Sequence, residues 1–312
     1  MLLAYTITFI VSLIFAALIF AGKLYDLHHF GNNVHGGKHN LHKYSTPRIG
    51  GVAIFIGLLA GLCTLYLLGY SDAKWQLQLL LCAGVVCGAG LIEDLMGVLS
   101  PLSRLCIILI ASVLAFILID AKMLDTSIDW VNRWLLDMPW LSFLVTILLV
   151  AGMTNANNMI DGLHGLMLFC SAVALASLAI CAYLVGDILI YHTSLLVLAA
   201  SLGVAVFNIP YGKIFAGDSG AYLLGFLLAE LALFLAHRNL GISPWCPVLI
   251  MIYPISDLLF SMFRRIFIQR TTPGTPDSIH LHSLIYRLLL LRVRDQDKNI
   301  TNIKASMTVW HV

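Results

Sequence analysis

Residues 165–207 read GLMLFCSAVALASLAICAYLVGDILIYHTSLLVLAASLGVAVF, and this stretch decides the class of fold. Two apolar runs, 165–185 and 188–207, flank Gly186-Asp187, and Asp187 is the only charged residue in the stretch. Each run has about the 20 residues that a helix needs to cross the hydrocarbon of a bilayer. Neither run has the polar face of a helix in a soluble protein. The stretch therefore predicts two consecutive membrane-spanning helices.

Similar apolar runs recur along the whole chain. Of its 312 residues, 60% are hydrophobic and only 11% are charged, whereas about 25% of the residues in a soluble domain are charged. We therefore predict an all-α, polytopic integral membrane protein that forms a single domain over residues 1–312. The fifth run is short unless its helix continues past Gly152. The nine expected spans lie near 2–22, 49–69, 76–92, 105–119, 139–152, 165–185, 188–207, 219–236 and 245–263, with a tenth segment near 283–291.

Positive charge is distributed unevenly between the loops. Of the 18 Lys and Arg residues, one side of the membrane receives only Lys74, Lys122, Arg133 and Arg238. The other side receives the loops around 23–48, 93–104, 153–164, 208–218 and 264–282. Lys and Arg accumulate in cytoplasmic loops, so we expect these five loops in the cytoplasm and the N-terminus outside. The loop 120–138, which is rich in Trp, is expected to lie on the outer surface of the membrane.

Two adjacent carboxylates, Glu93 and Asp94, end the third span, and Arg104 follows them. Charged groups are costly near hydrocarbon, and a solvated helix end is one explanation for the pair. The other explanation is chemical. Adjacent carboxylates orient a divalent cation or take a proton, and the fork of a guanidinium holds a phosphate.

The loop Asn155-Ala156-Asn157-Asn158-Met159-Ile160-Asp161-Gly162-Leu163-His164 is more polar than a turn requires. If the segment is helical, Asn155 and Asn158 lie at i and i+3 with Asp161 beyond them, and one face is rich in oxygen atoms. Oxygen atoms are the ligands that hard cations prefer. A plain turn, stabilised by Asn and Asp side chains bonded to the local backbone, is the alternative.

Segment 207–220 reads FNIPYGKIFAGDSG and places Asp218 between glycines at the start of an apolar helix. An Asp at this position is ordinarily a helix cap. The flanking glycines also allow a ligand to approach the backbone, and a helix N-terminus attracts phosphate. The segment is therefore either a capped helix start or a phosphate-binding turn.

Histidines mark the two remaining polar segments. His280 and His282 share a side if their segment is extended and diverge if it is helical; they are either donors to a diphosphate or surface residues. The loop 23–48 carries five irregularly spaced histidines, which favours a basic loop over a metal site. Its Lys43 and Arg48 precede the second span, where lipid phosphates lie. Together, the polar segments describe an Asp/Asn metal site among phosphate-binding groups, which is the apparatus of phosphoryl transfer.

Five blocks resemble, in order, the signature motifs of the polyprenyl-phosphate N-acetylhexosamine-1-phosphate transferases (glycosyl transferase family 4), a superfamily that includes the phospho-MurNAc-pentapeptide translocases. The resemblance covers about residues 20–290 and implies a helical membrane fold with a cytoplasmic cleft. It also implies a UDP-sugar donor, an undecaprenyl phosphate acceptor and dependence on Mg²⁺, with Mn²⁺ as an alternative ion. The five blocks are Thr46–Gly51, Gly90–Asp94, Asn155–Leu166, Phe207–Gly220 and Pro276–Arg287.

The same resemblance implies roles for individual residues. The metal ligands are matched by Asp218 and Asn158, and the acidic pair that activates or positions the acceptor phosphate by Glu93 and Asp94. The catalytic set is thus Glu93, Asp94 and Asp218. The nucleotide pocket is matched by Asn155, Asp161, His164, Asn208 and Phe215, with Phe215 stacked on uracil. Phosphate-binding positions are matched by Arg104, His280 and His282, and the entrance for the lipid phosphate by Lys43 and Arg48.

The implied reaction transfers a HexNAc-1-phosphate, or a related sugar-1-phosphate, from a UDP-sugar to undecaprenyl phosphate and releases UMP. Enzymes of this kind initiate the synthesis of surface polysaccharide, O-antigen or another cell-envelope glycan at the bacterial inner membrane. No nucleic acid is expected as a partner. A homodimer is left open, as is the choice between direct displacement and an aspartyl-phosphate intermediate.

Three departures from the family pattern bear on these roles. The acidic pair is Glu-Asp where most members have Asp-Asp, and position 164 is His where many members have Asp. The chain ends after Val312, where such proteins usually have one more span, so an inactive scaffold of the same fold is one alternative. A secondary transporter is another, because Glu230 and Asp257 lie within spans and suit a proton path. The polar clusters gathered on one side weigh against transport.

Overall fold

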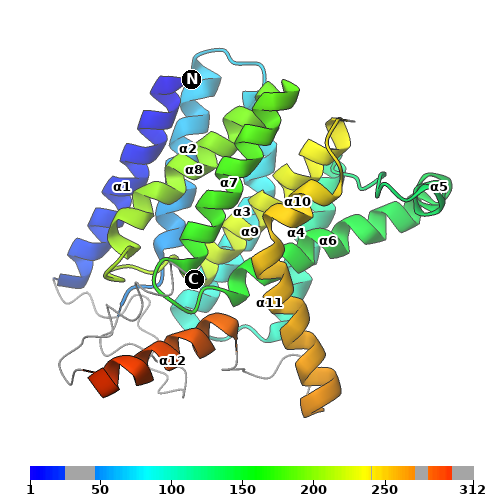
Figure 1. The fold of residues 1–312 in the computed structure, drawn as a ribbon. Coiled ribbons are helices and arrows are strands. Elements are labelled where there is room, and N and C mark those ends of the chain that lie inside the picture. Colours follow the sequence, from blue (N-terminus) through cyan, green and yellow to red (C-terminus); the bar gives the residue numbers. More distant parts are fainter. Residues whose placement is uncertain (25–45, 240, 271–279, 297–312) are drawn as a thin grey trace.

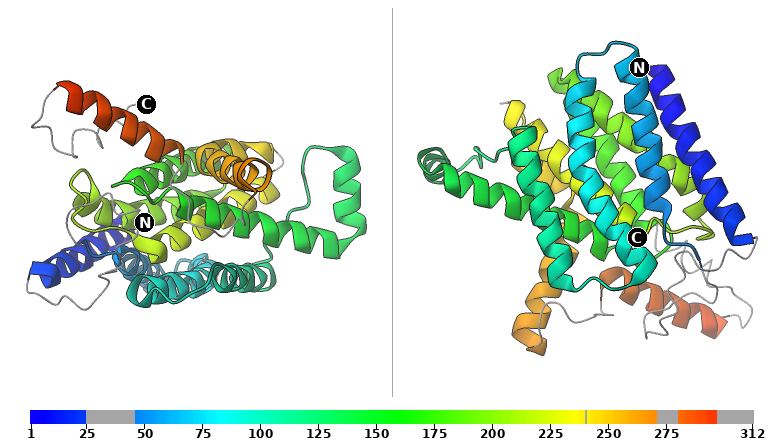
Figure 2. Two further views of the ribbon diagram at one scale, coloured as in Figure 1. Left: turned by 90° about the horizontal axis from the view of Figure 1, so that it is seen from below. Right: turned by 180° about the vertical axis from the view of Figure 1, so that it is seen from behind.

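The computed structural model describes residues 1–24, 46–239, 241–270 and 280–296, and the regular secondary structure of this part of the chain is helical (Figure 1). Among these residues, eight helices are long and apolar enough to cross a membrane. They pack into one bundle (Figure 2), which confirms the predicted all-α polytopic fold. The eight helices are α1 (Leu2–Leu24), α2 (Gly50–Leu67), α3 (Ala73–Met96), α4 (Pro101–Leu118), α6 (Pro139–Met159), α7 (Leu166–Val185), α8 (Ile188–Asn208) and α9 (Gly217–Arg238).

The ninth predicted span, 245–263, is not one helix. Helix α10 (Trp245–Ile250) ends early, and α11 (Ile252–Phe263) begins after Met251 and continues into a π-helical turn, η1 (Arg264–Gln269). Pro254 has no N–H to donate to the carbonyl of Ile250, and its ring crowds that carbonyl. The ninth predicted span is therefore interrupted, and the described residues contain eight continuous candidates.

Two further helices lie outside the bundle. Helix α5 (Asp129–Asp137) falls within the predicted outer loop and sits away from the bundle at the far end of the tilted α6 (Figure 1). Its exposed Trp130 and Trp134 pack edge to face, with ring centroids 5.0 Å apart. Helix α12 (Leu281–Gln296), the predicted tenth segment, lies across one end of the bundle (Figure 2). The placement of α5 on a membrane surface stays a prediction.

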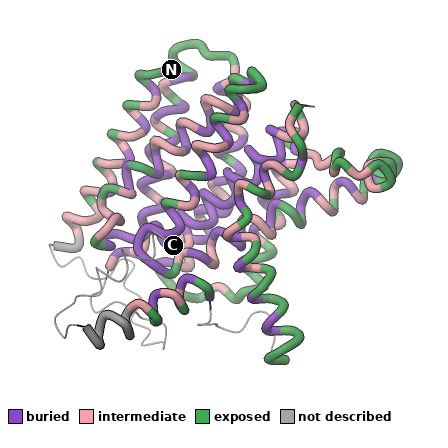
Figure 3. The backbone as a smooth tube through the Cα atoms, in the orientation of Figure 1, coloured by how far each residue is buried: buried purple, intermediate pink, exposed green. Residues whose placement is uncertain are grey.

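Helix α9 is the centre of the bundle. In its most apolar window, 94% of the residues are buried, against 22% for α1 and α4. It packs against α2, α3, α6, α7 and α8, and the buried residues gather along the middle of the bundle (Figure 3). Apart from the fully buried Glu230, the middle of the helix is apolar, and its other charged residues lie in its first and last turns. Asp218 lies at one of these ends.

The polar segments predicted to share one side meet at the end of the bundle where α12 lies. The N–H of Phe215 donates to the carbonyl of Pro47 at 2.8 Å, and the N–H of Gly50 donates to the carbonyl of Phe215 at 2.9 Å. Helix α6 runs to Met159, so the fifth span does continue past Gly152. The structure thus brings these segments together, while the side of the membrane that this end faces stays a prediction.

Candidate active site

The start of α9 is packed backbone to backbone against its neighbours. A Cβ at Gly90 of α3 would overlap the backbone nitrogen of Ser219. Gly217 has φ of +73°, and a Cβ there would overlap the carbonyl oxygen of Arg48. Only glycine permits both the close approach and the left-handed backbone at no steric cost. The main chain therefore fixes the position of Asp218.

Asp94 holds the first turn of α9. Its Oδ1 accepts the N–H of Asp218 at 2.8 Å, and its Oδ2 accepts the N–H of Ser219 at 2.9 Å. The side chain is almost fully buried. A negative charge at a helix N-terminus is favourable because the first N–H groups have no partner within the helix. Asp94, which the sequence placed in the catalytic set, therefore positions Asp218 through its backbone.

This capping changes one expectation about phosphate. The sequence suggested that the N-terminus of α9 is free to attract a phosphate group. Two of its N–H groups instead donate to Asp94. The positively charged side chains near Asp218 are therefore better candidates for binding phosphate than the N-terminus of α9.

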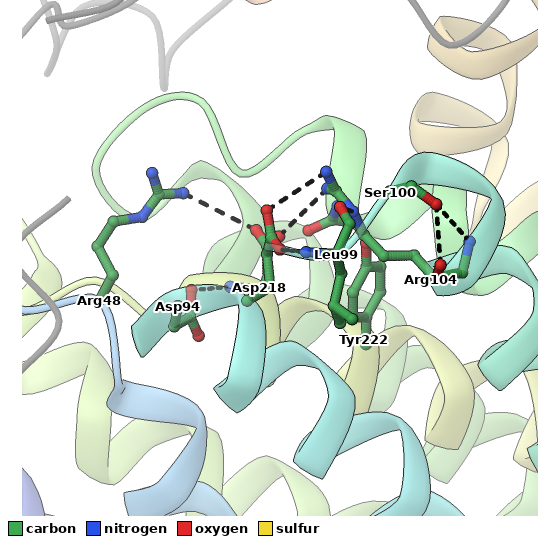
Figure 4. Close-up of polar contacts among 10 residues, drawn as sticks. Arg48, Asp94, Leu99, Ser100, Arg104, Asp218 and Tyr222 are labelled. Atoms are coloured by element: carbon green, nitrogen blue, oxygen red, sulfur yellow. Dashed lines mark hydrogen bonds and ion pairs between the residues drawn. The ribbon is translucent and has the colours of Figure 1, made fainter. Parts of the chain in front are cut away.

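Asp218 lies between two guanidinium groups (Figure 4). Nη1 of Arg104 is 3.5 Å from Asp218 Oδ2, and Nη2 of Arg48 is 3.9 Å from Asp218 Oδ1. Nη2 of Arg104 also lies 3.3 Å from Glu93 Oε1, while Glu93 Oε2 accepts the N–H of Leu99 at 2.8 Å. Two carboxylates and two guanidiniums thus form one partly exposed network at the end of the bundle.

The end of α6 adds oxygen atoms beside this network. Asn158 donates through Nδ2 to the hydroxyl of Tyr222 at 3.2 Å, and Asn155 lies half-buried one turn earlier. Among the described residues, the buried Asn158 Oδ1 and Asp161 Oδ2 have no hydrogen-bond partner. Burial raises the pKa of Asp161 to about 8; the Arg48 charge lowers it, and the carboxylates of Asp218 and Asp94 raise it. The charged groups of the network therefore act electrostatically on Asp161.

These oxygen atoms fit the ion that the family resemblance implies. Mg²⁺ binds through few carboxylate or carbonyl oxygens and keeps several waters, and Asp218, Asn158 and Asp161 supply such oxygens. Two of the oxygens are buried and find no partner in the residues that the structure describes, which is costly unless a ligand or water satisfies them. The described residues contain no ready cluster of three His, Cys, Asp or Glu ligands, so the fit rests on this oxygen set.

Among the residues predicted to line the nucleotide pocket, His164 and Phe215 are neighbours. The rings of His164 and Phe215 lie 5.6 Å apart at a tilt of 38°, and a Cβ at Gly212 would overlap the His164 ring. Asn208 donates to the carbonyl of Ile214 at 2.6 Å, so it shapes the turn that carries Phe215. Burial lowers the pKa of His164. Phe215 is 8% exposed, and its stacking on uracil stays a prediction.

The two histidines near α12 share a side. Their rings stack with centroids 5.5 Å apart and planes within 6°, although His282 already lies in the first turn of α12. Nε2 of His282 is 2.6 Å from where a Cβ on Gly162 would lie. Burial lowers the pKa of His282 to about 4, with opposing effects from Asp257 and His280. Lys43 lies outside the described residues.

Three polar residues that the sequence did not assign to the site support it. Tyr222 lies one turn after Asp218 and accepts from Asn158. Asn157 bonds to the carbonyl of Ala221 at 3.0 Å and so ties α6 to α9. Asp257 contacts His280 at 2.9 Å. The position of Tyr222 at i+4 from Asp218 could have indicated its role; the other two depend on contacts between distant segments.

Comparison with known proteins places this site in a family. The family model described as "Glycosyl transferase family 4" matches residues 76–236. This range contains Glu93, Asp94, Asn158 and Asp218. The blocks around Thr46–Gly51 and Pro276–Arg287 lie outside it.

Curated bacterial relatives are similar over most of the chain. A "Probable undecaprenyl-phosphate N-acetylglucosaminyl 1-phosphate transferase" of Bacillus subtilis (strain 168) is 30% identical over 243 residues, which are 78% of this chain and 66% of that protein. A "Decaprenyl-phosphate N-acetylglucosaminephosphotransferase" of Mycobacterium leprae is 33% identical and covers 80% of this chain and 68% of its own. An "Undecaprenyl-phosphate alpha-N-acetylglucosaminyl 1-phosphate transferase" of Salmonella typhi is 29% identical, with 79% and 66% covered. The chain thus spans about two thirds of the length of these relatives.

Proposed function

The chain belongs to glycosyl transferase family 4, a family of membrane phospho-sugar transferases, and from this premise we propose that it transfers a HexNAc-1-phosphate from a UDP-sugar to a polyprenyl phosphate. UDP-N-acetylglucosamine is the donor to test first, because the names of the relatives specify N-acetylglucosamine phosphate. Undecaprenyl phosphate is the acceptor to test first for the same reason.

The observation that carries the proposal is the network around Asp218. Its carboxylate faces Arg48 and Arg104 over 3.5–3.9 Å, while buried oxygens of Asn158 and Asp161 lack partners within the described part of the chain. Such long ion pairs and unpaired oxygens are weakly satisfied in the protein alone. They suit a site that binds anionic phosphates together with a cation.

The reaction needs positioning and charge neutralisation more than acid–base chemistry. A phosphate monoester has a second pKa of about 6, so the acceptor is largely dianionic near neutral pH. Its oxygen forms a bond to the sugar-bearing phosphorus, the bond from that phosphorus to the bridging oxygen breaks, and UMP leaves with the electron pair. A bound Mg²⁺ would supply neutralisation of the diphosphate charge.

The chain's own residues have distinct tasks in this proposal. Asp218 and Asn158, with Asp161 beside them, would hold the ion. Arg104 and Arg48 would bind phosphate oxygens, in the fork geometry that guanidinium favours. Asp94 keeps Asp218 in place, and Glu93 orients Arg104 through their 3.3 Å ion pair. Phe215 and Asn208 are proposed to contribute to the binding of the nucleoside.

The proposed cellular role is the first committed step of a cell-envelope glycan at the bacterial inner membrane, with the site in the cytoplasm and the N-terminus outside. The orientation is testable with single cysteines in two exposed turns. Ser71→Cys, at the N-terminal end of the bundle, should react with an impermeant maleimide in intact cells above the wild-type background. Ser100→Cys, next to the site, should react only after lysis. The reverse pattern would overturn the orientation.

The activity is tested by UMP release from purified protein. UDP-N-acetylglucosamine should yield UMP only when polyprenyl phosphate and Mg²⁺ are both present, and EDTA should stop the release. A panel of other UDP-sugars then identifies the preferred donor. Absence of UMP from every UDP-HexNAc, in protein with a normal thermal transition, would favour an inactive scaffold. Uptake of a solute by proteoliposomes without UMP release would favour a transporter.

A further inference from the structure

A buried carboxylate on α11 holds the start of α12. Oδ2 of Asp257 lies 2.9 Å from Nδ1 of His280, and Oδ1 accepts the N–H of Leu281 at 3.3 Å. Asp257 is only 5% exposed. Ser261, one turn later on α11, has its Oγ 3.2 Å from the same nitrogen of His280. Both oxygens of the carboxylate thus contact the residues that begin α12.

This contact fixes the orientation and the proton position of His280. An ionised carboxylate only accepts hydrogen bonds, so Nδ1 of His280 must carry the proton. The hydrogen bond of one ring nitrogen determines what the other nitrogen can do. With Nδ1 protonated, Nε2 of His280 accepts a hydrogen bond when the ring is neutral and donates one, as a phosphate oxygen requires, when the ring is charged.

The first turn of α12 connects this pair to the site. The His280 ring stacks on His282, and His282 Nε2 packs against Gly162, which follows Asp161 in the chain. Tyr286, one turn further along α12, is buried in a cluster with Leu163 of the same loop and Leu166 at the start of α7. The loop that carries Asp161 is thus covered by residues whose placement depends on Asp257.

We propose that Asp257 is a positioning residue for the transfer reaction. By holding His280 in one tautomer and docking the first turn of α12, it places the histidine pair beside Asp161 and the donor diphosphate. The inference rests on the proposed function. A path for protons through a transporter is the competing use of a buried carboxylate, but Asp257 already has two partners at the site, whereas a carrier must release and regain its proton freely.

The test compares substitutions at two buried carboxylates. Asp257→Asn keeps the shape but removes the charge, and Asp257→Glu keeps the charge on a longer side chain. Asp187→Asn is the matched control, because Asp187 is also buried and paired, with Arg238 at 3.1 Å, but lies at the opposite end of the bundle. Each variant is assayed for UMP release and for its thermal midpoint.

For Asp257→Asn we expect the donor kcat/KM to fall about 10- to 100-fold, as for partners that orient a reactive histidine. The acceptor KM should change less than about threefold, and Asp257→Glu should recover part of the loss. Asp187→Asn should keep its activity at a comparable loss of thermal midpoint. Full activity in Asp257→Asn, or equal losses in Asp257→Asn and Asp187→Asn, would overturn the proposal.

A second readout does not depend on turnover. In protein labelled with ¹⁵N-histidine, the His280 resonance is identified by its loss in His280→Gln. It should report a proton on Nδ1 in the wild type and its transfer to Nε2 in Asp257→Ala. An unchanged His280 resonance in Asp257→Ala would refute the contact. If the wild type releases no UMP yet the resonance shifts, the proposed activity fails while the positioning contact stands.

Discussion

Asp187 and Asp218, two carboxylates at opposite ends of the bundle, differ in how they are paired. At the end opposite the site, Asp187 accepts from Ile190 N–H at 3.2 Å, from Arg238 Nε at 3.1 Å and from Asn239 Nδ2 at 3.0 Å. At the other end, Asp218 faces Arg104 and Arg48 only at 3.5 and 3.9 Å. Nearby, Asn158 Oδ1 and Asp161 Oδ2 have no partner among the described residues.

This difference distinguishes Asp187, a helix cap, from Asp218, a candidate binding residue. Asp187 is satisfied by hydrogen bonds from three donors, as expected of a residue that stabilises the start of α8. Beside Asp218, the buried Asn158 Oδ1 and Asp161 Oδ2 have no partner among the described residues. Buried polar groups are ordinarily paired, so a ligand that satisfies these oxygens would lower the free energy of the protein.

The largest expected effect compares Asp218→Asn with Asp187→Asn. Asp218→Asn removes a negative charge from the proposed ion site and should reduce turnover by at least about 100-fold, the cost of losing one preorganised electrostatic group. It should also weaken Mg²⁺ binding. Asp187→Asn should lower stability by about 1–3 kcal/mol and leave kcat unchanged. Near-normal turnover in folded Asp218→Asn would show that the reaction needs Asp218 no more than it needs Asp187.

The next effect separates the two members of the acidic pair. In Asp94→Asn an NH₂ group replaces one oxygen and faces a backbone N–H of α9, so one of the two bonds is lost. Hydrogen bonds to charged groups contribute about 1.5–3 kcal/mol, and turnover should fall about 10- to 150-fold. Raising the pH should not rescue the variant. A rescue by pH, or a larger loss in Glu93→Gln, would make Asp94 a base rather than a positioning residue.

A third prediction concerns Phe215, whose ring is mostly covered. If it stacks on uracil, Phe215→Ala loses about 1–3 kcal/mol and raises the KM for the UDP-sugar about 5- to 150-fold. The acceptor KM and the Mg²⁺ dependence should stay nearly unchanged, and Phe215→Trp should be tolerated. Steady-state assays in thermally matched protein measure both constants. A lower thermal midpoint with equal changes in both KM values would identify Phe215 as a core residue.

The smallest effect tests the glycine contact beneath the site. Gly90→Ala places a methyl group against the backbone of Ser219 and should cost about 1–3 kcal/mol, as overpacking does. Gly88→Ala, two residues earlier on α3, meets no atom within 4 Å. It should be neutral or stabilising by up to about 1 kcal/mol through helix propensity. Equal thermal midpoints for the two variants would contradict the backbone contact.

Much of the fold could be predicted because single helices in a membrane are recognisable from local composition. The eight apolar runs up to residue 236 all correspond to helices, and the family assignment from five ordered blocks, with its class of enzyme, is confirmed. The break at Met251 was missed because hydropathy averages over Pro254, whose effect depends on one missing hydrogen bond.

The candidate site was predicted as a set of residues but not as a set of contacts. The predicted alternation of loops placed Glu93, Asp94, Asn158 and Asp218 on one side of the membrane from the sequence alone. That Asp94 caps α9 depends on residues more than a hundred positions apart, which no local pattern encodes. The same holds for Asp257 and His280, which lie 23 positions apart in the chain.

The backbone packing around Asp218 has a consequence for motion. Side chains adjust to one another by changing rotamers, but Gly90 and Gly217 have none to change. Any displacement of the Asp218 backbone therefore requires α3 and α9 to move as rigid bodies. We expect the amides of Asp218 and Ser219 to be among the slowest in the molecule to exchange their hydrogen. The proposed reaction has two large anionic substrates, which must enter and leave the site. We expect the motion that admits them where the loop after α6 packs on α12 through side chains.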